Sequence, residues 1–88
     1  MSAEFKKLLQ NEAELNEWTR IYFSEEASKD GLMDQFGLIS TLGKLDLGNK
    51  KPTDDDVKSY FKGLGKTKIN YDEFHAYLKK LIQSVVNA

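Results

Sequence analysis

The stretch Ile69-Asn70-Tyr71-Asp72-Glu73-Phe74 joins a short apolar segment to the start of a helix. From Tyr71 onward, apolar side chains recur every three or four residues, which is the spacing of one buried helix face. These residues are Phe74, Tyr77, Leu78, Leu81, Ile82 and Val85. The preceding residues 68–70 are too few for an independent strand. We therefore expect them to pair with residues 32–34 in a two-stranded antiparallel ribbon.

Two helical patterns lie in the first half of the chain. Asn11 followed by Glu14 resembles a capping box. It predicts a helix with Leu15, Trp18 and Tyr22 on one face. A second helix is expected over residues 35–47, and its buried face would carry Phe36, Ile39 and Leu42.

A third helix is expected after Thr53, which is a favourable N-cap. Asp54, Asp55 and Asp56 then occupy the first turn, where the helix dipole favours negative charge. Gly63 and Gly65 end this helix. Its apolar face consists of Val57, Tyr60, Phe61 and Leu64. We expect three phenylalanines to lie in the core, namely Phe36, Phe61 and Phe74.

These patterns predict one small all-α domain with four main helices and a short loop ribbon. Residues 1–10 would form an N-terminal helical extension, and 48–52 a linker. Residues 11–47 and 53–88 would form two helix–loop–helix units of similar size. A chain of 88 residues is long enough for one hydrophobic core.

Composition narrows the classes of partner. The net charge of −1 argues against nucleic-acid binding, which usually requires a basic face. No apolar run reaches the length of a membrane span, and the charged N-terminus does not resemble a signal peptide. The absence of cysteine fits a reducing compartment. We therefore expect a cytoplasmic protein with neither a nucleic-acid nor a membrane partner.

The two units resemble the paired EF-hands of the calmodulin superfamily, over roughly residues 15–82. The linker Leu47-Gly48-Asn49-Lys50-Lys51-Pro52-Thr53 is similar to the joint between paired hands in calmodulin-like and myosin light-chain lobes. The resemblance implies a paired EF-hand fold. It also supplies a frame in which each loop can be tested for calcium ligands.

The second loop has lost its ligands in this frame. A calcium loop needs oxygen atoms at positions 1, 3 and 5 and a bidentate Glu at position 12. With Glu73 at position 12, Ile69 takes the apolar position 8. Lys62, Leu64 and Lys66 then fall at positions 1, 3 and 5, where they offer ammonium groups and a hydrocarbon. We expect no metal here and a structural role for Glu73, either accepting loop hydrogen bonds or facing water.

The first loop keeps more oxygen atoms but lacks the clamping carboxylate. Placing Gly31 at position 6 puts Gly37 at position 12, where it supplies no ligand. An alternative frame begins at Ser24, is two residues longer and also ends on Gly37. In the frame with Gly31 at position 6, the oxygen-bearing residues at positions 1, 3, 5 and 9 are Glu26, Ser28, Asp30 and Asp34. We expect at most weak calcium binding, with Asp34 acting as a helix cap and Asp30 as a turn residue.

The resemblance implies a calcium-independent, light-chain-like adaptor, that is, a subunit of a motor protein. Loops without ligands are characteristic of light chains that hold an amphipathic helix whether or not calcium is present. The single-lobe length resembles the small light chains of class I myosins. The expected partner is a basic amphipathic helix, an IQ motif of an unconventional (class I) myosin heavy chain. We expect the protein to be monomeric before it binds.

The adaptor hypothesis assigns residues to two parts of a binding surface. An apolar groove would bury the aliphatic anchors of the partner, and acidic side chains at its rim would meet Lys and Arg. The groove residues would be Leu42, Leu45, Tyr77, Leu78 and Leu81. The rim residues would be Glu25, Glu26, Asp54, Asp55 and Asp56.

The alternative hypothesis is a small dimeric EF-hand protein that senses calcium weakly through the first loop. An enzyme is not expected, because no nucleophile elbow, phosphate-binding glycine loop or zinc site is present in the sequence. His75 is the single histidine, and we expect it to be a half-exposed helical residue.

Overall fold

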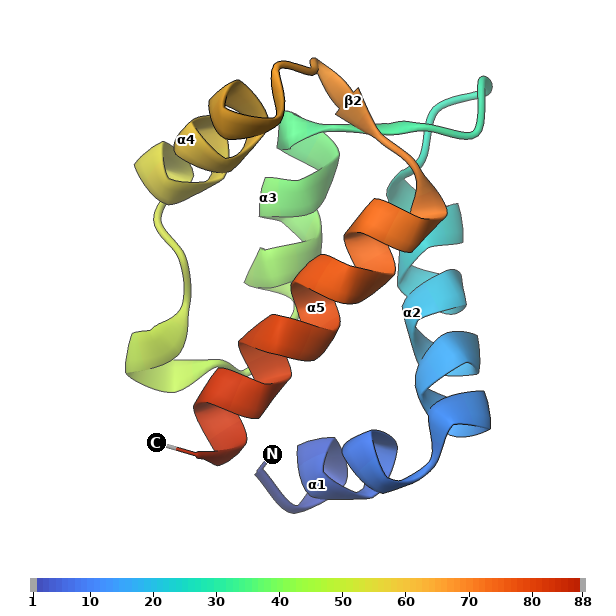
Figure 1. Cartoon of the computed structure of the whole chain (residues 1–88), viewed down its shortest axis with the longest axis vertical. Coiled ribbons are helices and arrows are strands. Elements are labelled where there is room, and N and C mark those ends of the chain that lie inside the picture. The colour runs from blue at the N-terminus through green and yellow to red at the C-terminus, as the bar shows by residue number, and fades with distance from the viewer. Residues whose placement is uncertain (1, 88) are drawn as a thin grey trace.

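The computed structural model describes residues 2–87, which form α-helices, one short 3-10 helix and a two-stranded sheet (Figure 1). In chain order the elements are α1 (Ser2–Gln10), α2 (Glu12–Glu26), β1 (Met33–Asp34), α3 (Gln35–Gly43), η1 (Gly48–Lys50), α4 (Asp54–Leu64), β2 (Lys68–Ile69) and α5 (Tyr71–Val86). Residues 1 and 88, at the ends of the predicted extension and second unit, lie outside the described residues. The predicted mainly helical fold is confirmed.

Helices α2 to α5 each begin at a residue whose side chain accepts a hydrogen bond from the first turn. These N-caps are Asn11, Asp34, Thr53 and Asn70. Thr53 and Asn70 belong to capping boxes, in which Asp56 and Glu73 accept a hydrogen bond from the backbone N–H of the cap. The predicted caps Asn11, Asp34 and Thr53 are confirmed. Of the capping box predicted for Asn11 and Glu14, the structure has the hydrogen bond from the Glu14 N–H to Asn11. At the other end of α4, Gly65 adopts a left-handed conformation with a φ of 68°.

A short antiparallel ribbon joins the two interhelical loops. Met33 pairs with Ile69, and Asp34 pairs with Lys68. Met33 and Ile69 are both fully buried. The predicted ribbon is therefore confirmed, and its Met33–Ile69 end lies inside the core.

Helix α5 runs through the middle of the molecule (Figure 1). It packs mainly on α1, α2 and η1, whereas α3 packs on α2 and α4. The predicted N-terminal extension forms the separate helix α1, whose Phe5 is buried and meets Trp18 edge-on at 6.0 Å between ring centroids. One cluster makes up the core: Phe5, Leu15, Phe23, Met33, Leu38, Leu42, Leu45, Leu47, Val57, Phe61, Ile69, Phe74, Leu78 and Ile82.

The structure corrects the predicted end of the second main helix. Helix α3 stops at Gly43, four residues before the expected end at Leu47. Leu45 and Leu47 are both buried, although residues two apart on a helix point about 200° away from each other. Since both side chains enter the core, the chain has to leave the helical path before them.

The structure also corrects the predicted position of Phe36, which is 68% exposed. The reason lies in the next residue, because Gly37 packs against α2. A Cβ atom at Gly37 would lie 2.9 Å from Met33 Cγ and 3.1 Å from the Glu26 carbonyl oxygen. This close approach turns Gly37 and Leu38 inward, so Phe36 points outward. The other two predicted core phenylalanines, Phe61 and Phe74, are confirmed as buried.

These differences in burial predict that the same Phe→Ala substitution causes a large loss of stability at one site and almost none at the other. Phe74→Ala should lower the free energy of unfolding by about 3–5 kcal/mol, because it leaves a cavity in the core. Phe36→Ala should change it by less than about 0.5 kcal/mol, because the ring is mostly in solvent. Urea denaturation of both variants measures the difference. Similar losses at the two positions would contradict the observed orientation of α3.

Candidate functional site: a groove between α4 and α5

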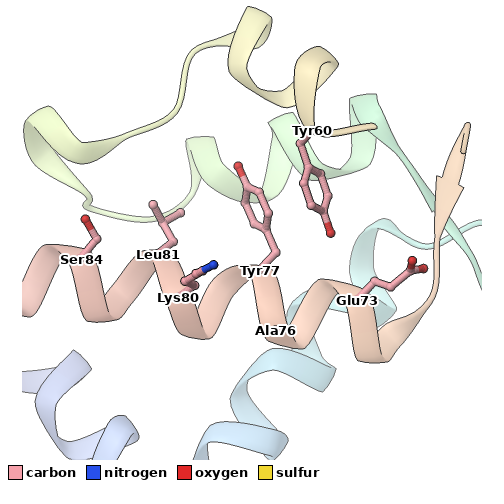
Figure 2. A pocket seen from close by; sticks show the side chains of 7 residues that line it. All are labelled: Tyr60, Glu73, Ala76, Tyr77, Lys80, Leu81 and Ser84. Atoms are coloured by element: carbon pink, nitrogen blue, oxygen red, sulfur yellow. The ribbon is translucent and has the colours of Figure 1, made fainter. Parts of the chain in front are cut away.

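An open groove of about 570 Å³ lies between α4 and α5. It exists because α4 packs mainly on α3, whereas α5 packs mainly on α1, α2 and η1. The residues that line it are Tyr60, Glu73, Ala76, Tyr77, Lys80, Leu81 and Ser84 (Figure 2). On α5, Glu73, Tyr77 and Leu81 follow at four-residue spacing and therefore share one face of the helix. Ala76, Lys80 and Ser84 form the neighbouring row.

Two tyrosines, one from each helix, meet at the groove. The ring centroids of Tyr60 and Tyr77 are 4.6 Å apart, with the planes tilted by 53°. Burial raises the pKa of Tyr77 to about 12, and the nearby Tyr60 and Asp56 add to this shift. Burial, together with the charge of Glu73, also raises the pKa of Tyr60. Both phenols are therefore neutral at pH 7 and present apolar ring faces with a hydrogen-bonding tip.

The structure separates the predicted groove residues into two groups. Tyr77 and Leu81 line the groove. Leu42, Leu45 and Leu78 are instead buried in the core, with exposed fractions of 1%, 6% and 0%. The prediction that these three line an open groove is wrong for this structure. Leu78 follows Tyr77 by one residue, which turns its side chain about 100° around α5 and onto the buried face.

Five lining residues were not predicted as part of a binding surface: Tyr60, Glu73, Ala76, Lys80 and Ser84. The sequence carries a signal for Glu73, because it continues the four-residue spacing of Tyr77 and Leu81. Ala76, Lys80 and Ser84 lie on the neighbouring row and have no such signal. Tyr60 has no such signal either. Its place at the groove depends on how α4 lies relative to α5.

The residues predicted to form the acidic rim also fall into two groups, one on α4 and one on α2. Asp54 and Asp55 are exposed on the first turn of α4, and Asp56 is close enough to influence the pKa of Tyr77. Glu25 and Glu26 lie at the end of α2, where their carboxylates are 2.9 Å and 3.3 Å from Lys44 Nζ. Those two residues do not line the groove. Only the α4 carboxylates remain as rim candidates.

In the second loop, the Glu73 carboxylate contacts a lysine of the same loop. Lys66 Nζ is 2.8 Å from Glu73 Oε2, and the Asn70 N–H donates to Oε1 at 2.9 Å. Lys66 first, and then Asn70, hold the pKa of Glu73 below its ordinary value. The predicted hydrogen bond from loop backbone to Glu73 is confirmed. An ammonium group therefore contacts one oxygen of this carboxylate, and a backbone N–H contacts the other.

In the first loop, the predicted oxygen-bearing residues each have a different partner. Asp30 accepts from the Leu32 N–H at 3.0 Å and pairs with Lys68 of the second loop at 2.7 Å, which lowers its pKa. Asp34 caps α3, and Glu26 forms an ion pair with Lys44. Ser28 uses its backbone groups in the turn, with its N–H bonded to the Leu32 carbonyl at 2.7 Å. Within residues 2–87, no three acidic or histidine side chains converge in a way that could hold a metal ion.

His75 belongs to a hydrogen-bonded cluster between α2 and α5 rather than to the groove. Its Nδ1 lies 2.9 Å from Thr19 Oγ1, and its Nε2 lies 3.4 Å from a carboxylate oxygen of Glu12. The Tyr71 hydroxyl contacts Thr19 Oγ1 at 2.7 Å and donates to the Asn16 carbonyl at 3.0 Å. Because Thr19 is fully buried, its hydroxyl is shielded from any substrate. The contacts of this cluster link α2 to α5. The His75 side chain is 15% exposed, so it is more buried than the half-exposed residue that the sequence predicted.

No protein-family model, curated protein or solved structure matches this chain. In residues 2–87, no helix combines the length and the apolar character needed to cross a membrane.

The Lys66–Glu73 contact predicts a pH dependence. The pKa of Glu73 is lower in the folded protein than its ordinary value of 4.5, so this carboxylate stabilises the fold above that pH. The stabilisation is lost as the pH falls through the lowered folded-state pKa. Glu73→Gln should therefore be less stable than wild type at neutral pH, and the gap should narrow at about pH 3.

Urea denaturation at the two pH values tests this, with Asp72→Asn as the control at an exposed neighbouring acid. A gap that stays constant between neutral and acidic pH would show that the Glu73 charge does not stabilise the fold.

Proposed function

We propose that this chain is a single EF-hand lobe that binds a basic amphipathic helix of a protein partner in the groove between α4 and α5. The carrying observation is the groove itself, which combines Tyr60, Tyr77 and Leu81 with the carboxylate of Glu73. Asp54 and Asp55 are exposed on the first turn of α4, the helix that carries Tyr60. An apolar floor beside acidic side chains fits a helix with one apolar and one cationic face.

The loop geometry supports the assignment to paired EF-hands. Each unit runs helix, loop, short strand, helix, and the two strands pair antiparallel. The paired residues Met33 and Ile69 are those that fall at position 8 of the two loop frames. The resemblance in the sequence and the arrangement of the elements therefore agree.

The contacts of the loop carboxylates support a function that is independent of calcium. Glu73 already holds a cation, the Lys66 ammonium, and Asp30 holds Lys68. A calcium ion would have to displace these groups and would then find no oxygen ligands at Lys62 or Leu64. The proposed lobe therefore binds its partner without a metal cofactor.

The proposed partner is an IQ motif of a class I myosin heavy chain, which makes the chain a non-catalytic light chain of the cytoplasm. Burial of apolar partner residues would supply most of the affinity, and the α4 carboxylates would set orientation and association rate. Coating the partner helix would stiffen it as a lever.

Calorimetry with IQ-type peptides in EDTA tests the proposal, with one-to-one binding expected. Leu81→Asp should weaken binding at least about tenfold, because it places a charge on the apolar floor. Leu64→Asp is the matched control, because Leu64 is 40% exposed and does not line the groove. Its affinity should stay within about twofold of wild type.

Circular dichroism should show that both variants keep their helices. Equal weakening by both substitutions, or no binding of any IQ-type peptide by a protein that instead dimerises, would reject the groove as the binding site.

The proposal also predicts that the folded protein does not respond to calcium. Amide NMR signals of Gly31, Gly37 and Gly65 should stay unmoved when micromolar calcium is added, since lysine ammonium groups already neutralise the loop carboxylates. Saturable shifts confined to the first loop would instead support the weak calcium sensor. Shifts in the second loop would contradict the loop frame itself.

A further inference from the structure

Glu73 lines both the groove between α4 and α5 and a second hollow beside the second loop. It lies at the end of the groove row that continues through Tyr77 and Leu81. Figure 2 shows it on the first turn of α5, at the opposite end of the groove from Leu81 and Ser84. The negative charge of Glu73 adds to the effect of burial in raising the pKa of the Tyr60 phenol across the groove. The residue that closes the second loop is therefore also a groove residue.

The cation that now sits on Glu73 is replaceable. The Lys66 side chain is 50% exposed, and the Glu73 side chain is 22% exposed. An ion pair in contact with solvent is held only weakly, so a second cation can compete for it. The carboxylate itself is fixed independently, because its other oxygen accepts the Asn70 N–H. Loss of Lys66 would thus leave Glu73 in place with one oxygen free.

We propose that Glu73 accepts one Lys or Arg side chain of the partner helix, in direct competition with Lys66. This inference rests on the proposed helix-binding function and names the charged contact within it. An Arg is the better fit, because its planar guanidinium can stack on the ring of Tyr60 while it bonds the carboxylate. The partner would place its apolar residues over Tyr77 and Leu81, one and two turns further along α5.

The other charges at the groove give the bound helix a direction. Lys80 lines the groove about two turns beyond Glu73 on α5, and it repels a cation at that end. Asp56 influences the pKa of Tyr77 but does not line the groove. Glu73 is therefore the carboxylate that both lines the groove and has an exchangeable partner.

The chain contains a matched control for this contact. Lys68 pairs with Asp30 at 2.7 Å, close to the 2.8 Å of the Lys66–Glu73 pair, and its side chain is 37% exposed. Neither Lys68 nor Asp30 lines the groove. Lys66→Ala and Lys68→Ala therefore remove the same charge from neighbouring loop positions, but only the first one frees a groove carboxylate.

The test is calorimetry in EDTA with an IQ-type peptide, repeated with each peptide Arg replaced in turn by uncharged citrulline. Lys66→Ala should tighten binding about two- to fivefold, the range set by an exposed ion pair. Lys68→Ala should leave the affinity unchanged. Glu73→Gln should weaken binding, and Lys66→Ala should then have no further effect in the Glu73→Gln background. One citrulline position should reproduce the loss caused by Glu73→Gln.

Three results would overturn the inference while leaving the proposed function intact. They are an unchanged or weaker affinity of Lys66→Ala, an equal gain from Lys68→Ala, and an effect of Lys66→Ala that persists without the Glu73 charge. Lys66→Gln provides a second variant with a longer polar side chain, and it should behave like Lys66→Ala. If the wild-type protein binds no IQ-type peptide at all, the proposed function fails, and this inference fails with it.

Discussion

The pairing of Met33 with Ile69 is the constraint on which the rest of the molecule depends. It joins the loop between α2 and α3 to the loop between α4 and α5, and both side chains are fully buried. The residues directly after Met33 and Ile69, which are Asp34 and Asn70, are the N-caps of α3 and α5. The ribbon therefore sets where α3 and α5 start, and the apolar faces of these helices then close the core.

The contacts across and within the loops are made by protein groups, with Lys68 on Asp30 and Lys66 on Glu73. Exposed ion pairs of this kind contribute little individually, so most of the stability must come from the buried apolar cluster. The same lysines shape the proposed function, because they neutralise carboxylates that would otherwise favour a metal ion.

The sequence predicted the parts of the fold that depend on local chemistry. Asn11, Asp34 and Thr53 act as caps because their side chains reach the first turn of the helix that follows. The predicted buried face of α3 was wrong at Phe36, because Gly37 and Thr41, which an apolar pattern does not mark, belong to the buried face. The close approach of Gly37 to α2 decides which side is buried, and that contact belongs to the tertiary structure.

The candidate site was predicted in part for a similar reason. Tyr77 and Leu81 were placed at a groove, but Leu42, Leu45 and Leu78 were expected there and lie in the core. A helical repeat identifies apolar faces, but it does not say which part of a face neighbouring helices cover. Lys66 was recognised as unable to bind calcium, whereas its contact with Glu73 required the folded loop.

Chemical-shift mapping tests the central claim most directly, that the groove between α4 and α5 receives a helix without metal. Isotope-labelled protein in EDTA would be titrated with an unlabelled IQ-type peptide. Binding in the groove should give the largest amide shifts at Tyr60, Ala76, Tyr77 and Leu81 and should leave the outer face of α2 around Ile21 unmoved. Shifts concentrated on α2, or none at saturating peptide, would contradict it.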